Sequence, residues 1–155
     1  MLEAHAHNQL KHLFQGEALP WPHNLTLSRL VARALRRGDS ALIQLDTASH
    51  DFWWLGLLVP LCLQPSNSVL VLSKKQRDHL FNIELPILKT KGFKLACWEG
   101  HNSPSEGQVW VLDYANLVDA FQKGYLHSKH LIIPEAEFLT ERLRDSLSLR
   151  ISLQD

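Results

Sequence analysis

The chain of 155 residues lacks an excess of charge and a cysteine framework. Its 16 basic and 16 acidic residues cancel, so no global field favours nucleic acid or a membrane, and any nucleic-acid contact has to be a local patch. Its two cysteines, Cys62 and Cys97, stand far apart in apolar runs. This placement predicts buried, reduced thiols and excludes both a disulfide framework and half of a metal site.

Targeting and membrane signals are also lacking. Residues 1–5 have neither the basic region nor the apolar core of a signal peptide, and the longest apolar run, 52–63, is too short to span a bilayer. We therefore expect a soluble cytoplasmic protein without a membrane partner. The nine histidines show no metal-ligand spacing. No Ser/His/Asp or Cys/His set stands at the predicted strand ends, so nothing supports a hydrolase.

Short apolar runs that alternate with helical stretches are the main pattern present. The runs lack clean polar alternation, as strands covered on both faces do, and the intervening helices imply a parallel sheet with right-handed crossovers. The sequence predicts a three-layer α/β fold with a mostly parallel sheet of about five to six strands flanked by helices. The expected strands are Ser40–Leu45, Ser68–Leu72, Phe93–Trp98, Gln108–Leu112, His130–Ile133 and, for the tail, 150–153; the expected helices between them are 51–63, 75–90, 114–123 and 135–147.

Two further helices are predicted before the first strand. Apolar positions at helical spacing predict one helix over 2–14, and the linker after it contains Pro20 and Pro22. A second helix is predicted over Leu25–Arg37, with Leu27, Leu30, Val31, Ala34 and Leu35 on one face and Gly38 as its end. We therefore divide the chain into an N-terminal helix and Pro-rich linker, 1–24, and an α/β region, 25–155.

Ligands of parallel α/β folds sit at the carboxyl ends of the strands, so the residues that follow each strand are the candidates. The first strand leads into Thr47, Ala48, Ser49, His50 and Asp51. A phosphate-binding loop needs glycines and a lysine, whereas here a carboxylate stands about where the lysine belongs and would repel a triphosphate. The alternative is a plain strand-to-helix turn capped by Thr47 or Ser49.

Basic residues form two candidate patches. Ser73, Lys74 and Lys75 follow the second strand, and cations at a helix N-terminus oppose the helix dipole, which favours an anionic ligand nearby. The alternative is a Ser-capped helix with a solvated basic turn. A second group of basic side chains shares one face of the helix predicted over Leu25–Arg37. This face is either a stripe that contacts phosphates or a solvated surface. This group comprises Arg29, Arg33, Arg36 and Arg37.

Three other features have local structural explanations. Asp113 after the fourth strand is expected to cap a helix. After the fifth strand, Pro134 suits a first helical position and Glu135 suits a first turn, so local helix rules alone account for this segment. Trp53 and Trp54 are either core residues or an interface anchor.

Taken in order, these segments resemble the N-terminal motor lobe of superfamily 2 helicases, closest to the DinG and XPD type. The resemblance implies a RecA-like, P-loop NTPase-type architecture with Mg-ATP and nucleic acid as ligands. Trp21 to Arg36 is similar to the opening of divergent DinG-like proteins of cyanobacteria. The segments that carry the match are Leu27–Gly38, Ser40–Gln44, Leu55–Leu61, Val69–Lys74, Val109–Val118 and His130–Glu137.

The departures from the helicase pattern fall on its ATP residues. The loop 47–51 lacks the glycines and the lysine, Pro134 replaces the motif II aspartate, and Glu137 replaces the final histidine. Glu135 is the only motif II carboxylate that matches. Two cysteines cannot hold the iron–sulfur cluster of this group. We therefore expect no cofactor, because the ligands of ATP and Mg²⁺ are absent, and an incomplete lobe, because the match ends soon after motif II.

These observations predict a helicase-like domain that is inactive as an ATPase and acts as a nucleic-acid-binding or scaffolding lobe. Its expected partners are single-stranded DNA and a second motor lobe or another protein. Lys74 and Lys75, with Ser73, are the first candidate contacts, and Arg29, Arg33 and Arg36 are the second. One alternative is a protein–protein interaction module that docks a partner through the tryptophan pair or the N-terminal helix. Another is an active ATPase that uses atypical residues.

Overall fold

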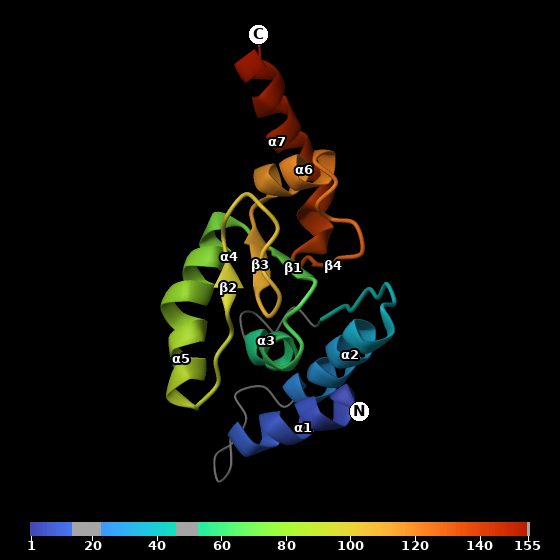
Figure 1. Cartoon of the computed structure of the whole chain (residues 1–155), viewed down its shortest axis with the longest axis vertical. Coiled ribbons are helices and arrows are strands. Elements are labelled where there is room, and N and C mark those ends of the chain that lie inside the picture. The colour runs from blue at the N-terminus through green and yellow to red at the C-terminus, as the bar shows by residue number, and fades with distance from the viewer. Residues whose placement is uncertain (14–22, 46–52, 155) are drawn as a thin grey trace. The chain divides into compact units, whose positions relative to one another are not determined.

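The computed structural model describes residues 1–13, 23–45 and 53–154 (Figure 1). The chain divides into two compact units. Met1–Pro65 and Leu88–Leu95 form the first, which we call the helical unit. Ser66–Ile87 and Ala96–Asp155 form the second, the sheet unit. Both units are made of segments that are discontinuous in the chain.

The helical unit contains α1 (Leu2–Leu13), α2 (Asn24–Arg37) and α3 (Trp54–Leu63). The two helices predicted before the first strand are confirmed as α1 and α2. Their packing differs from the predicted face of α2, because Leu30 is 44% exposed and Ala34 only half-buried, while Ser28 and Ala32 are buried. A buried cluster in the core of the unit consists of Ala6, Leu10, Leu13, Ala32 and Val59.

Helices α2 and α3 approach closely at Gly56. The Gly56 N–H donates to Asn24 Oδ1 at 3.0 Å, so the fully buried Asn24 satisfies a first-turn donor of α3 that has no partner within its own helix. A Cβ on Gly56 would meet Asn24 Oδ1 at 2.8 Å and Leu27 Cδ2 at 2.9 Å. Trp54, at the start of α3, is 1% exposed and stacks on Trp53 with ring centroids 4.3 Å apart. Trp54 is therefore a core residue.

After α2 the chain does not form the predicted first strand. Gly38, with φ of 70°, ends α2 as expected, and its N–H donates to Ala34 O at 2.9 Å. Residues 40–45 then run as coil and pair with none of the described strands. The prediction of a strand over Ser40–Leu45 is wrong for this structure: the side-chain pattern suits a strand, but backbone pairing needs a neighbour.

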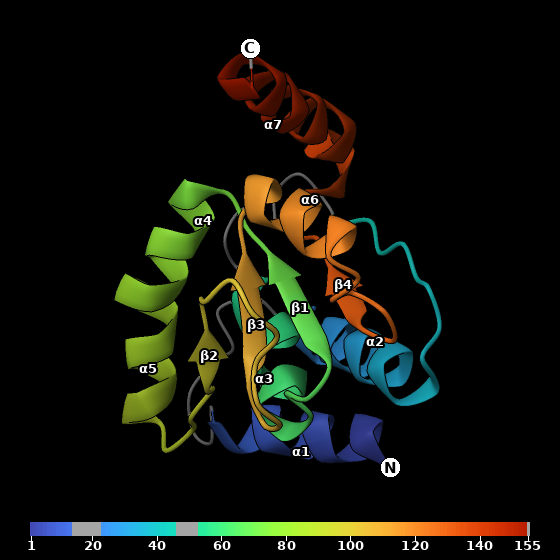
Figure 2. The same cartoon turned by 45° about the horizontal axis from the view of Figure 1, so that its top comes forward.

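The sheet unit is built on a four-stranded, all-parallel sheet in the order β2-β3-β1-β4 (Figure 2). The sheet has four strands in the described chain, fewer than the five to six predicted. All residues of the two central strands are buried, which explains their continuous apolar sequences. Val69 pairs with Trp110 on one side and with Leu131 on the other. The strands are β1 (Ser68–Val71), β2 (Cys97–Trp98), β3 (Val109–Leu112) and β4 (His130–Ile132).

One face of this sheet packs on the helices that follow β3 and β4. Val69, Val71 and Trp110 form a buried cluster with Tyr114 and Leu117 of the helix that follows β3. Leu139 and Leu143 of the C-terminal helix pack against the same cluster. The sheet unit therefore has a core of its own on this face.

The helices between the strands largely follow the prediction. Helix α4 (Lys74–His79), a π-helical turn (Leu80–Glu84) and α5 (Leu85–Thr90) form one continuous stretch, as expected for 75–90. Helix α6 (Tyr114–Gln122) matches the helix predicted over 114–123.

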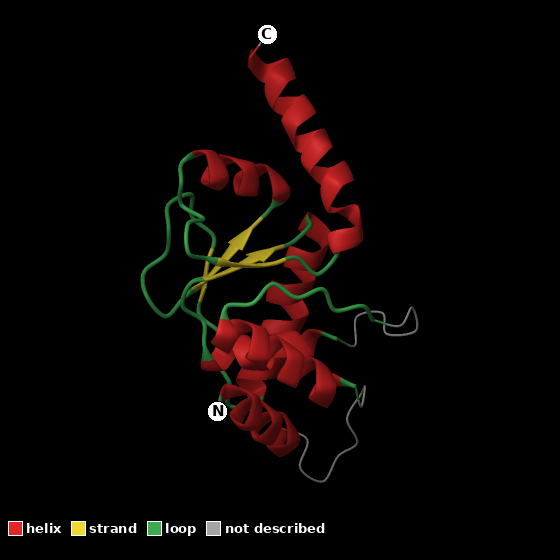
Figure 3. Cartoon of the chain, turned by 90° about the vertical axis from the view of Figure 1, so that its right-hand side faces the viewer, coloured by secondary structure: helices red, strands yellow, loops and turns green. Residues whose placement is uncertain are grey.

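The C-terminal part differs from the prediction. A 3₁₀ turn (Ala136–Phe138) precedes α7 (Leu139–Gln154), so Pro134 and Glu135 lie before the helix instead of in its first turn. The tail 150–153 belongs to α7 and is not a sixth strand, and Figure 3 shows this helix running without a break to the C-terminus. No helix among the residues described is both long and apolar enough to cross a membrane.

Candidate functional site

The candidate site is the edge of the sheet at which β1, β3 and β4 end. Because these strands are parallel, their carboxyl ends meet at this edge. Each strand leads into a helix or a helical turn that begins with a polar residue. These residues are Ser73 after β1, Asp113 after β3 and Glu135 after β4.

The residues after β1 form a capping box that leaves two lysines exposed. Ser73 Oγ accepts from the Gln76 N–H at 3.2 Å, and Gln76 Oε1 accepts from the Ser73 N–H at 3.2 Å. The Ser-capped helix considered above is therefore present, with Ser73 half-buried and its hydroxyl engaged. Lys74 and Lys75, in the first turn of α4, are exposed and make no ion pair in the part of the chain that is described.

After β3, Asp113 caps α6 as predicted. Its Oδ1 accepts from the Asn116 N–H at 2.7 Å. The carboxylate also lies at the positive end of the helix dipole, which stabilises its charge there. Asp113 therefore has a structural partner of its own.

After β4, Glu135 is held by an arginine from α7. Arg142 Nη2 donates to Glu135 Oε2 in a short ion pair, and Arg142 Nη1 donates to Tyr114 Oη at 3.2 Å. The guanidinium lies 5.3 Å from the ring centroid of Tyr114 and 5.2 Å from that of Phe138. Partial burial lowers the pKa of Arg142, but the hydrogen bonds to Tyr114 and Glu135 outweigh it and leave this pKa raised. We call these four residues the Arg142 cluster.

The Arg142 cluster limits what Glu135 can do chemically. A carboxylate that orients an attacking water has to direct an oxygen at the reacting group, whereas Glu135 Oε2 is bonded to a permanently charged guanidinium, which leaves only Oε1 for that task. Sequence reasoning missed Arg142. The sequence contained one signal for this ion pair: Arg142 follows Glu135 by two helical turns, and a continuous helix would place both residues on one face.

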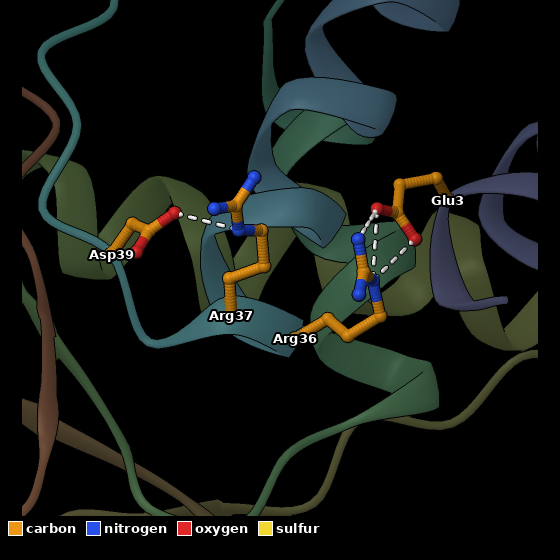
Figure 4. A network of polar contacts seen from close by, with 4 residues as sticks. All are labelled: Glu3, Arg36, Arg37 and Asp39. Atoms are coloured by element: carbon orange, nitrogen blue, oxygen red, sulfur yellow. Dashed lines mark hydrogen bonds and ion pairs between the residues drawn. The ribbon is translucent and has the colours of Figure 1, made fainter.

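The second predicted patch lies on α2, in the helical unit. Arg36 binds Glu3 of α1 in a bidentate ion pair, with Nε at 2.9 and 3.0 Å and Nη2 at 2.7 Å from the carboxylate oxygens (Figure 4). The hydrogen bond from Arg36 lowers the pKa of the Glu3 carboxyl, and the same bond raises the pKa of Arg36. Arg37 pairs with Asp39 at 3.0 Å. Arg36 is therefore engaged inside the unit.

Arg29 and Arg33 remain exposed on α2, and neither makes an ion pair within the described residues. They belong to the helical unit, whereas Lys74 and Lys75 belong to the sheet unit. The loop Thr47, Ala48, Ser49, His50 and Asp51 lies outside the described residues. Across the ranges 1–13, 23–45 and 53–154, no three His, Cys, Asp or Glu side chains are placed to hold a metal ion.

Comparison with protein-family models, with curated proteins and with solved structures finds no match to this chain.

Proposed function

We propose that the chain is a helicase-like lobe of the DinG type, RecA-like in architecture, that lacks ATP chemistry and binds single-stranded nucleic acid. Two observations support this proposal. The motif segments follow the order of the helicase lobe, and the sheet that contains four of the six expected strand regions is parallel throughout. The three-layer arrangement of such a lobe is part of the proposal.

The exposed pair Lys74 and Lys75 is the observation that supports nucleic-acid binding most directly. Both lysines lie in the first turn of α4, where their charges oppose the helix dipole. The capping box of Ser73 and Gln76 secures the helix without them, and no acidic side chain in the described chain neutralises them. A bound phosphate would relieve this unfavourable electrostatic arrangement. We assign the contacts to the two lysines and a positioning role to Ser73.

The state of Glu135 supports the absence of ATP hydrolysis. It is the only motif II carboxylate, and Arg142 holds it in an ion pair. Pro134, next to it, offers no ligand for Mg²⁺. In this proposal the sheet edge keeps the architecture of a motor while its acidic residue serves to attach α7.

Nucleic-acid binding is tested by titrating a labelled oligothymidine with the protein at low salt and following fluorescence anisotropy. We expect saturable binding that weakens steeply as salt is added, because released counterions drive it. No binding at any salt concentration would refute the nucleic-acid role.

The absence of ATP chemistry is tested separately by calorimetry with Mg-ATP and by phosphate release with and without oligothymidine. We expect neither heat of binding at micromolar ATP nor turnover. Steady turnover, or micromolar affinity, would establish the atypical ATPase instead.

A second candidate function, a protein–protein interaction module, is favoured by apolar side chains that the structure leaves exposed. The surfaces first considered for docking are used within the chain: Trp54 is buried, and the apolar face of α1 packs in the core of the helical unit. Leu42, which is 89% exposed, offers a different surface. Light scattering coupled to size exclusion decides whether this surface takes part in self-association.

A further inference from the structure

Phe138 presents an exposed aromatic ring in the turn that follows β4. The residue is 44% exposed, whereas aromatic side chains usually bury most of their surface in a core or an interface. Phe138 ends the 3₁₀ turn Ala136–Phe138, and its N–H donates to Glu135 O at 3.0 Å. The backbone of this turn is therefore fixed while part of the ring faces solvent.

The guanidinium of Arg142 covers one face of this ring. It lies 5.2 Å from the ring centroid of Phe138, within the range of a cation–π contact. Hydrogen bonds to Glu135 and to Tyr114 Oη hold the same guanidinium, so Arg142 and the ring that it contacts keep a defined orientation. The exposed surface of Phe138 is then the opposite face of the ring and its edge. An oriented ring with a free face can stack on another planar group.

Phe138 and the exposed lysines of α4 follow neighbouring strands of the sheet unit. Strand β4 pairs with β1, and Ile132 lies opposite Leu70 (Figure 2). Three residues beyond this pair, the chain reaches Glu135 on one side and Ser73 on the other. The lysines come directly after Ser73, and Phe138 comes one 3₁₀ turn after Glu135. The aromatic ring and the cations therefore belong to adjacent strand ends at one edge.

The charges near Phe138 favour a neutral planar ligand over a phosphate. Glu137 and Glu141 are exposed, and neither makes an ion pair within the described residues. Their carboxylates would repel a phosphate but not an uncharged heteroaromatic base. The edge thus divides into a cationic part at β1 and an aromatic part at β4. Proteins that bind single-stranded nucleic acid combine these two parts, because cations follow the backbone while aromatic rings stack on the bases.

We propose that Phe138 is the base-stacking residue of this edge: one base of a single strand lies on the free face of its ring while Lys74 and Lys75 hold the phosphates. This inference rests on the proposed nucleic-acid binding and adds the contact that selects a single strand. A base inside a duplex is already stacked and paired, whereas an unpaired base has a free face. Arg142 is a positioning residue, because it orients the ring and is itself held by Glu135.

The test titrates the whole chain into two labelled strands of equal length, oligothymidine and a strand that is abasic throughout. Both strands carry the same phosphates, so only the bases differ. Phe138→Ala should weaken binding of oligothymidine at least about fivefold and leave binding of the abasic strand unchanged. It should also leave the slope of log affinity against log salt unchanged, because no charge is altered. Phe138→Trp retains a stacking ring and should bind oligothymidine at least as tightly as the natural chain.

Phe121→Ala is the matched control. Phe121 is 74% exposed on α6 and makes no ring contact among the described residues, so its replacement should change neither affinity. A natural chain that binds neither strand would refute nucleic-acid binding as a whole. Binding of oligothymidine that Phe138→Ala and Phe121→Ala affect equally would overturn the stacking contact alone. Equal weakening of both strands by Phe138→Ala would overturn it too, since the residue would then serve only the fold.

Discussion

At the scale of single residues, Arg142 joins parts of the sheet unit that are distant in the chain. It bonds to Glu135 after β4 and to Tyr114 at the start of α6, and it lies over the ring of Phe138. Arginine suits this position because its planar, permanently charged group can bond in its plane and stack on its faces. The cluster attaches the beginning of α7 to the carboxyl edge of the sheet.

Replacing Arg142 tests this attachment. Arg142→Met keeps the length of the side chain but removes the ion pair and the cation–π contacts, and it should lower the free energy of unfolding by about 1–2 kcal/mol. Arg33→Met, at an exposed arginine of α2 that makes no ion pair within the described residues, is the matched control and should change it by less than about 0.5 kcal/mol. Urea denaturation measures both. Equal effects of the two substitutions would refute the role of the cluster.

The thiol of Cys62, which is half-buried and not fully buried as predicted, provides a prediction about pH. Burial raises the pKa of this thiol from 9.0 to about 11. Only the thiolate reacts with iodoacetamide, so at pH 8 the folded protein should react at Cys62 about 100-fold more slowly than the protein in urea. Because the pKa of Cys62 is higher in the folded protein, the contribution of its neutral thiol to the free energy of unfolding is complete below pH 9. This contribution is lost as the pH rises towards 11. Peptide mass spectrometry measures the modification of Cys62. Equal rates in folded and unfolded protein would contradict the raised pKa of this thiol.

At the scale of elements, the sequence predicted those whose determinants are local. Gly38 ends α2, Asp113 caps α6, and the apolar runs of β1 and β3 are buried central strands. The failures involve partners that are distant in the chain. Ser40–Leu45 has the side chains of a strand but no neighbour in the structure, and a linear pattern cannot show where a neighbour lies. The Glu135 partner, Arg142, is a different case, because it lies only seven residues away and its helical spacing was a local signal.

The capping box of α4, which follows β1, allows the structural role of Ser73 to be tested separately from the proposed binding by the lysines. Ser73→Ala removes the acceptor for the Gln76 N–H and should lower the free energy of unfolding by about 1 kcal/mol. Because we assign the phosphate contacts to the lysines and a positioning role to Ser73, the affinity for oligothymidine should change less than twofold. Ser103→Ala, in an exposed loop, is the control for stability. A large loss of affinity without a loss of stability would make Ser73 a contact residue.

At the scale of the whole molecule, the balance of 16 basic and 16 acidic residues means that binding to an anion has to be local. Arg36 and Arg37 are neutralised by Glu3 and Asp39. The exposed pair Lys74 and Lys75 is then the basic group best placed at the candidate edge of the sheet. The proposed binding of nucleic acid therefore depends on this pair more than on any other residues.

The most direct test compares two double charge reversals in the oligothymidine titration. Lys74→Glu with Lys75→Glu alters the proposed contacts, and Lys89→Glu with Lys94→Glu makes the same change of charge at two other exposed lysines. The first pair places acids in the first turn of a helix, where they are favourable, so loss of binding cannot be ascribed to unfolding of α4. We expect it to weaken binding strongly and to reduce the slope of log affinity against log salt by about 1.4, or about 0.7 for each phosphate contact. The second pair should leave that slope unchanged, and equal effects of the two reversals would contradict the account.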